Sequence, residues 1–319
     1  MDFILPGAIL PAVVYHYCSV ETFYHIISNH TLRLSDIEKS NDFMEKKWAT
    51  RQCLNYIEQN ISSPYYPCSA APTLAEQLLE EMKRQFAEYN TMILAACFSS
   101  RRDLLSQWRG YGDNGYGVCI GVSSGTEFKA AFKRAETFLH FSNGMLPSGL
   151  VFHSIKYSTK FLEEISMNLF CSCLRHSDVS IPEAARDLVH LIYPALPFFK
   201  SAAFSEEAEW RCVYYPELPA PPYVTDTFDE QKFQHLLSAQ LVEKEFDHFR
   251  MLPLAYRLRK HNLVPYRDMS FDASHEPFIR SVTIGPKCDL DRETVKLFLE
   301  QSGIHLDMSD IYLSDVSYR

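Results

Sequence analysis

The pattern of apolar and polar residues predicts a strand followed by a helix at the start of the chain. Residues 13–17, VVYHY, have strand composition. The next stretch, residues 19–30, places apolar side chains at helical spacing behind a serine suited to cap a helix. A brief strand and polar helical segments are expected in residues 32–60. The run 73–90 is strongly helical, because apolar residues recur in it every four positions.

Apolar runs that favour buried strands dominate the middle of the chain. Residues 91–100, TMILAACFSS, form a continuous apolar run that suits a central strand. A short helix, a glycine-rich turn and another strand are expected directly after it. The pattern then predicts a helix over 124–140, a strand over 150–157, and two helices over 158–200 that separate near Ser180.

The last third of the chain repeats this mixture. A strand is expected near residues 209–215 and a helix over 229–247, after a proline-rich stretch. Residues 277–319 predict a strand, a helix that ends near Ser302, and a final strand. The predicted fold class is therefore α+β, with widely dispersed strands and helices around them.

Composition and charge are those of a folded protein with no broad nucleic-acid surface. The 319 residues are 46% apolar and 22% charged. The net charge of -9 argues against coating of nucleic acid, because that mode requires many Lys and Arg side chains to neutralise phosphates. A local basic patch is compatible with this charge, and Arg101, Arg102 and Arg109 crowd beside Trp108.

The cysteines and the first residues indicate a cytoplasmic protein without a membrane partner. Nine cysteines are scattered without the repeated spacing of a disulfide framework or a zinc site, so reduced thiols are expected. The start, MDFILPGAILPAVVYHY, carries Asp2 in place of a basic region and is too short to span a bilayer. It fits neither a signal peptide nor an anchor.

An acidic stretch, residues 202–215 (AAFSEEAEWRCVYY), places carboxylates at the start of a strand. Alternation would put Glu207, Glu209 and Arg211 on one face, with the apolar residues between them on the other. Two acids on one face beside an arginine can shift the protonation of one another. The alternative is a solvated helix start capped by Ser205.

Two further stretches hold candidate binding residues. In FSSRRDLLSQWRGYGDNGYG, Trp108 and Tyr111 offer planar surfaces, Arg109 is a cation beside them, and the glycines permit close approach of a ligand. The alternative is a helix docked by its aromatic residues and followed by a tight turn. His16, in YHYCS, is either a functional residue or a structural histidine of a strand.

The order of these pieces resembles a known family. YHYCSVETFYHIISNHTLRLSDIEKSND, CFSSRRDLLSQWRGYGDNGYGVCIGV, FSEEAEWR, SVTIGPK and VSYR look like a large bacterial family of unknown function that is similar to ADP-ribosyltransferases. The resemblance implies one domain over residues 1–319, with two small, strongly bent, split sheets that form an NAD cleft and helices around them. Helical insertions would lie at about 55–90, 160–200 and 216–265.

The resemblance also implies roles for particular residues. His16 would hold a ribose hydroxyl of NAD, with Tyr17 and Ser19 beside it. Tyr111 or Trp108 would pack on the nicotinamide ring.

The resemblance also implies roles for the acids and the arginines. Glu209 would be the catalytic acid, and Glu207 would orient or deprotonate the acceptor. Arg109 or Arg211 would pair with the pyrophosphate or with the acids. Asn41 and Asp42 in SND belong to the same pattern, at the pyrophosphate or adenosine end.

The implied activity is transfer of ADP-ribose from NAD to a macromolecular acceptor, protein or nucleic acid. NAD is then a consumed substrate and no metal is required. A bacterial toxin or anti-phage effector, with an antitoxin or regulatory partner, fits the resemblance. The alternatives are an NAD glycohydrolase, with water as acceptor, and a non-catalytic module that binds a nucleotide or a partner protein.

Overall fold

The fold was analysed in a computed structural model that describes most of the chain. The described residues are 9–39, 45–66, 72–89, 91–125, 149–175, 180–215, 249–259, 261–271 and 277–318. The predicted helices at 124–140 and 229–247 lie outside them almost entirely, as do Asn41 and Asp42. Among the described residues, no helix is long and apolar enough to cross a membrane.

The described strands form one large, bent sheet that does not close on itself. Its main path runs in the order β11-β10-β4-β1-β3-β2-β9-β7, while β5 and β8 pair with β6 and β9. The strands are β1 (Val13–Cys18), β2 (Thr31–Asp36), β3 (Leu94–Ser99), β4 (Val118–Ser123), β5 (Gly149–Ser154), β6 (Glu209–Tyr215), β7 (Phe249–Met251), β8 (Ala255–Arg259), β9 (Asn262–Phe271), β10 (Ile279–Ile284) and β11 (Ile311–Leu313).

The sheet splits at the central strand β3. Along one edge, β3 pairs with β6 over its whole length. On the other edge, its first residues pair with β2 and its last residue, Ser99, pairs with Tyr15 of β1. Between these points β1 and β2 diverge. On this edge of β3 the backbone of Cys97 therefore faces the split, which is the gap between β1 and β2, whereas its other edge pairs with β6. The coarse expectation of a mixed α and β fold with a bent sheet is therefore confirmed, but the described strands form one large sheet and not the two small sheets that the resemblance implies.

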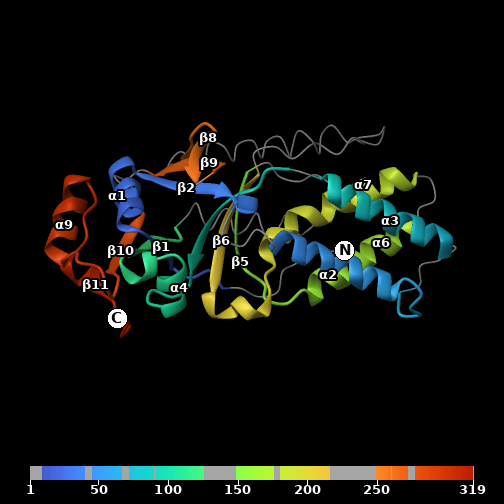
Figure 1. Ribbon diagram of the computed structural model, residues 1–319, viewed down its shortest axis with the longest axis horizontal. Helices are drawn as coiled ribbons and strands as arrows, with labels where there is room; N and C mark the ends of the chain where they lie inside the picture. Colours follow the sequence, from blue (N-terminus) through green and yellow to red (C-terminus); the bar gives the residue numbers. More distant parts are fainter. Residues whose placement is uncertain are drawn as a thin grey trace.

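Helices cover the two faces of the sheet and create two cores. Four long helices lie together at one end of the molecule (Figure 1) and pack on the face that carries Ala95 and Val213. Two others pack on the opposite face, over Phe98 and Cys212. The first group is α2 (Glu45–Asn60), α3 (Pro72–Glu88), α6 (Lys160–Arg175) and α7 (Ile181–Ile192), and the second is α1 (Val20–Asn29) and α9 (Arg292–Gln301).

Most predicted elements are present with close to their expected bounds. Ser19 caps α1 by accepting a hydrogen bond from Thr22 N at 3.1 Å. Ser180 begins α7 with a capping box, as the expected separation of the two helices requires. The insertions at about 55–90 and 160–200 are largely helical.

The described residues of the insertion at about 216–265 differ from its prediction as a helical segment. Its described part forms β7, β8 and the start of β9, which are strands at the margin of the sheet. Charged residues stand on β8 and Pro265 interrupts the apolar run of β9, so the period-two pattern of a buried strand is missing there. The expectation of reduced cysteines holds for seven of the described cysteines but not for Cys171, which is disulfide-bonded.

Candidate functional site

The acidic stretch enters β6 through a sharp local turn. A short 3-10 helix, η4 (Ala202–Glu207), is capped by Ser201 and not by Ser205. It ends at Ala208, whose φ of 46° lies in the left-handed region, and β6 begins at the next residue. Glu207 therefore stands on the helix and not on the strand, whereas Glu209 and Arg211 share one face of β6 as expected.

Both acids nevertheless meet at a buried lysine. Lys200 Nζ lies 2.6 Å from Glu207 Oε2 and 3.2 Å from Glu209 Oε2. Arg211 donates to Glu209 Oε1 from Nε at 2.9 Å and from Nη2 at 2.6 Å. The side chains of Lys200 and Glu209 are only 2% and 6% exposed. We call these four residues (Lys200, Glu207, Glu209 and Arg211) the ion cluster.

Backbone pairing explains how Lys200 reaches the acids. Lys200 N donates to Lys156 O at 3.0 Å, and Lys156 N donates to Phe198 O at 2.8 Å. Glu209 N donates to the Tyr157 hydroxyl at 2.8 Å. Lys200 was missed in the sequence because it follows an apolar run, LPFFK, that predicts the end of a helical segment and gives no sign of an ion pair nine residues downstream.

The electrostatics of the cluster keep Glu209 ionised. Burial raises the pKa of its carboxyl, but the charges of Arg211 and Lys200 outweigh burial and hold the pKa below its ordinary value. Arg211 is held by Glu209 and by Pro197 O, to which Nη1 donates at 2.6 Å. Arg211 thus pairs with an acid, one of the two expected roles.

Cys97 is the exposed point of the central strand. Its neighbours on β3, Ala96 and Phe98, are buried, whereas Cys97 is exposed. It lies opposite Arg211 in the sheet register, and its side chain is hydrogen-bonded to Glu209. The long helices cover this face at Ala95 but leave Cys97 uncovered, so the face is open beside the ion cluster.

His16 occupies the split of the sheet. Its Nδ1 lies 2.9 Å from Cys97 O, the carbonyl that faces the split. A carbonyl only accepts, so Nδ1 carries the proton and Nε2 is an acceptor. Burial lowers the pKa of His16, although the bond to Cys97 partly opposes this. The imidazole is therefore neutral at pH 7.

Tyr111 and Trp108, one turn apart, lie in different surroundings. Tyr111, at the end of α4 (Leu105–Gly110), is 38% exposed. Burial of its hydroxyl raises the pKa of Tyr111, and the charges of Lys200, Glu207 and Glu209 act on the same hydroxyl. Trp108 is 0% exposed. The structure therefore brings Tyr111, and not Trp108, to the ion cluster.

Trp108 is the centre of a packed clamp, which it forms with Tyr17, Asp103, Gly112 and Ser314. Its Nε1 donates to Asp103 Oδ1 at 2.6 Å, and its ring packs edge-on against Tyr17 with centroids 4.9 Å apart. Asp103 also accepts from Ser314 Oγ at 2.7 Å. A Cβ on Gly117 would collide with the Cys18 carbonyl oxygen. The glycines of this motif serve a tight turn, as the structural alternative predicts.

The other predicted site residues have local structural roles or lie at the surface. The Tyr17 hydroxyl donates to Arg101 O and accepts from Leu104 N, both at 2.9 Å. Ser19 caps α1. Arg109 is exposed, with its guanidinium 5.0 Å from the ring centre of Tyr318.

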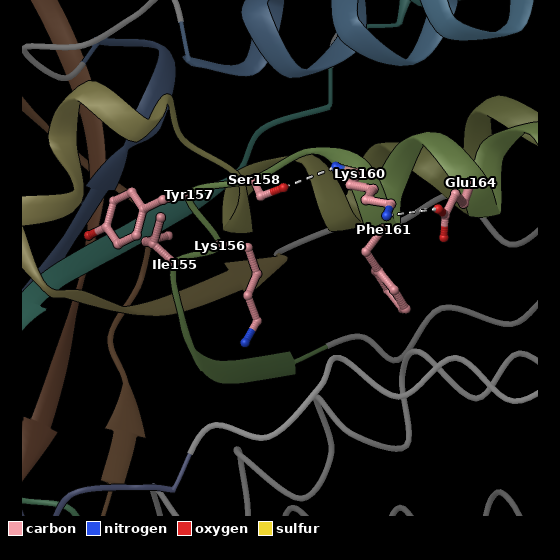
Figure 2. Close-up of a pocket in the computed structure, with 7 residues that line it drawn as sticks. All are labelled: Ile155, Lys156, Tyr157, Ser158, Lys160, Phe161 and Glu164. Atoms are coloured by element: carbon pink, nitrogen blue, oxygen red, sulfur yellow. Dashed lines mark hydrogen bonds and ion pairs between the residues drawn. The ribbon is translucent and has the colours of Figure 1, made fainter.

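A pocket of about 350 Å³ lies along the segment that carries Tyr157, which is one of its lining residues (Figure 2). Figure 2 shows the side chains of Tyr157 and Lys156 pointing away from one another, with Phe161 pointing to the same side as Lys156. Since Tyr157 also binds Glu209 N, this pocket adjoins the ion cluster. Its lining residues are Ile155, Lys156, Tyr157, Ser158, Lys160, Phe161 and Glu164.

Comparison with known proteins gives a match over part of the chain. A protein-family model described as a protein of unknown function (DUF2971) matches residues 107–212. This segment runs from α4 to β6 and contains Tyr111 and the ion cluster, but not His16. No curated protein and no solved structure matches the chain. Over this segment, the chain is thus similar to a family whose function is unknown.

Proposed function

We propose that the protein is an NAD-dependent ADP-ribosyltransferase whose site is the open face at Cys97. The observation that carries the proposal is the position of Cys97 among three motif residues. Its side chain is bonded to Glu209, its carbonyl accepts from His16, and Tyr111 lies close enough for the charge of Glu209 to act on its hydroxyl. The family resemblance assigns the binding of NAD to His16 and Tyr111 and its cleavage to Glu209.

The chemistry requires an ionised acid near the nicotinamide ribose. Cleavage of the glycosidic bond passes through an oxocarbenium-like transition state, and a fixed carboxylate stabilises the developing positive charge. The two donors from Arg211, the ammonium of Lys200 and the Cys97 side chain already surround Glu209. Because a thiol is a weak donor, a ribose hydroxyl would replace Cys97 at the carboxylate.

The remaining residues would orient NAD and the acceptor. Neutral His16 presents Nε2 as an acceptor for a ribose hydroxyl, and the exposed ring of Tyr111 would pack on the nicotinamide. Glu207 has a side chain that is 14% exposed, more than that of Glu209, and would orient or deprotonate the acceptor. Arg109 is the surface cation available to the pyrophosphate.

A second candidate function is a binding module without catalysis. It is favoured by the burial of Glu209 and by its two bonds to Arg211, an arrangement that also occurs in structural ion pairs. In that case the ion cluster would fix the start of β6, and the open face would bind a nucleotide without cleaving it.

Incubation with NAD tests both candidates. For the transferase we expect nicotinamide release together with a mass increase of an acceptor protein or nucleic acid. Release without a mass increase would indicate an NAD glycohydrolase, and binding without release would indicate the binding module. Absence of both binding and release would refute the proposal.

The variant Glu209→Gln tests the role of the carboxylate. We expect a decrease in the rate of cleavage of about 10²- to 10³-fold, the usual cost of losing one electrostatic stabiliser. The substitution also leaves Lys200 and Arg211 with one counter-charge fewer, which costs about 3 to 5 kcal/mol of stability. The double variant Lys200→Met/Glu209→Gln restores the charge balance, so it should fold better than the single variant and remain inactive.

A further inference from the structure

Two motifs of the family resemblance, SVTIGPK and VSYR, have no part in the proposed site, but both contact the turn that follows Tyr111. Lys287, the last residue of the first motif, donates from its backbone N to Gly115 O at 2.9 Å. Tyr318, in the second motif, donates from its hydroxyl to Asn114 Oδ1 at 2.5 Å. Both contacts join segments that are far apart in the sequence, so this turn takes its partners from the tertiary structure.

The backbone of the turn is strained. Asp113, Asn114 and Gly115 have φ angles of 50°, 55° and 92°. Residues other than glycine rarely adopt this left-handed region, and Asn or Asp that do so usually stand as single residues. A succession of such residues costs free energy and persists only where surrounding contacts hold it. We call residues 113–115 the left-handed turn.

Tyr318 is itself fixed in place beside the left-handed turn. Its ring packs directly on Gly115, because a Cβ at that glycine would lie 3.1 Å from a ring carbon of Tyr318. Lys287 Nζ lies 3.7 Å from the ring centre. Tyr318 N donates to Val316 O at 2.9 Å, and Val316 packs against the cluster around Trp108. The Tyr318 hydroxyl is therefore a fixed donor to the turn.

The left-handed turn is connected to two residues of the proposed site. Gly112 O accepts from Gly115 N at 2.9 Å, and Gly112 directly follows Tyr111. The guanidinium of Arg109 lies 5.0 Å from the ring centre of Tyr318. A change in the turn would therefore move the backbone next to Tyr111 and the surface on which Arg109 lies.

We propose that Tyr318 is a positioning residue, which holds the left-handed turn through Asn114 and thereby fixes Tyr111 and Arg109. It acts through these residues and does not touch a substrate. The role of the two fixed residues in binding NAD rests on the proposed function. The inference goes beyond that function, because it gives a role to a motif that lies outside the site.

Three variants of the full chain separate positioning from packing. Tyr318→Phe removes the hydroxyl and keeps the ring. Tyr116→Phe is the matched control, because Tyr116 is 51% exposed and its hydroxyl makes no hydrogen bond to the described part of the chain. Asn114→Gly places in the turn a residue that adopts a left-handed backbone without support. Tyr318→Phe should therefore have no effect when it is combined with Asn114→Gly.

Hydrogen exchange measured by mass spectrometry without NAD tests the effect on the turn. Tyr318→Phe should speed exchange in residues 111–117 by about three- to tenfold, the factor that corresponds to one hydrogen bond. Tyr116→Phe and the double variant Asn114→Gly/Tyr318→Phe should exchange as the wild type does. Unchanged exchange in Tyr318→Phe, or equally fast exchange in the double variant, would overturn the proposal.

Isothermal titration calorimetry with NAD tests the effect on the site. Tyr318→Phe should weaken NAD binding by about three- to tenfold, and the double variant should bind as the wild type does. Normal affinity of Tyr318→Phe despite faster exchange would show that the hydroxyl serves only local structure, which also overturns the proposal. If the wild type binds no NAD, the proposed function fails, while hydrogen exchange still decides whether Tyr318 positions Tyr111.

Discussion

The clamp around Trp108 and the ion cluster around Glu209 are built in opposite ways. The clamp buries an indole among glycines and satisfies its N–H with one carboxylate, Asp103. The ion cluster instead buries two cations and Glu209, together with the partly exposed Glu207, next to an exposed residue, Cys97. Apolar packing stabilises a fold outright, whereas buried ion pairs regain little more than their desolvation cost.

This difference separates residues that position the site from residues that can form it. Both regions belong to the motifs that carry the family resemblance, so the sequence alone does not distinguish them. The boundary falls within three residues, between buried Trp108 and exposed Tyr111. The clamp fixes α4 so that Tyr111 reaches the ion cluster.

The largest expected effect concerns the clamp. Trp108→Ala should lower the free energy of unfolding by about 3 to 5 kcal/mol, because it removes a fully buried ring and leaves a cavity. Chemical denaturation followed by circular dichroism measures this. Trp108→Phe keeps most of the apolar contacts and should cost clearly less. A loss below about 1 kcal/mol for Trp108→Ala would show that the clamp is not a packed core.

A smaller effect is expected at the buried lysine. Lys200→Met should cost about 2 kcal/mol, since the lysine bonds two acids while Glu209 keeps its bonds to Arg211. Lys83 on α3 is a matched control, because it bridges Glu58 and Glu80 at 3.0 and 2.8 Å on the surface. Lys83→Met should cost less than about 1 kcal/mol. Equal losses in the free energy of unfolding for the two variants would show that burial of the ion cluster does not make it more stabilising than a surface ion pair.

Local patterns predicted most of the fold, and long-range pairing accounts for what was missed. The α1 cap, the apolar run of β3 and the spacing of α3 are properties of short segments, so the sequence displays them. The margin strand β8 has exposed side chains along most of its length, and its stability comes from pairing with β9. A strand of this kind carries no apolar alternation from which it could be predicted.

The candidate site was predicted in part for the same reason. Alternation along β6 placed Glu209 and Arg211 on one face correctly, because it depends on neighbouring residues only. Glu207 was assigned to that strand, but the left-handed Ala208 ends the 3-10 helix directly after it. Lys200 and Cys97 reach Glu209 through the packing of separate segments, which no local pattern of the chain reports.

The pH dependence of stability should reveal the ionised acid. The folded pKa of Glu209 is depressed, so its contribution is complete above the pKa of an unfolded glutamate, about 4.3, and is lost as pH falls through the folded value. Between pH 5 and 3 the wild type should therefore lose more stability than Lys200→Met/Glu209→Gln. Urea unfolding across this range measures the difference.

His153 also titrates in this range, but it does not affect the comparison between the wild type and the double variant. Burial lowers the pKa of His153 to about 4, so the unfolded chain takes up that proton first and stability falls from about pH 6.5 downward. This loss is common to both proteins and cancels in the difference. Parallel curves for the wild type and the double variant would contradict a depressed pKa at Glu209.

The smallest effect on stability, and the sharpest test of the comparison, is expected at Tyr111. Tyr111→Ala should change the free energy of unfolding by about 0.5 kcal/mol, because the residue is partly exposed at the end of α4. The same variant should weaken NAD binding about tenfold, since stacking of an aromatic ring on a base is worth about 1 to 3 kcal/mol. Isothermal titration calorimetry measures the affinity, and Tyr111→Phe, which keeps the ring, should bind as the wild type does. If Tyr111→Ala binds NAD as the wild type does, Tyr111 has a structural role like that of Trp108. The open face at Cys97 would then lack the aromatic residue that is proposed to pack on the nicotinamide.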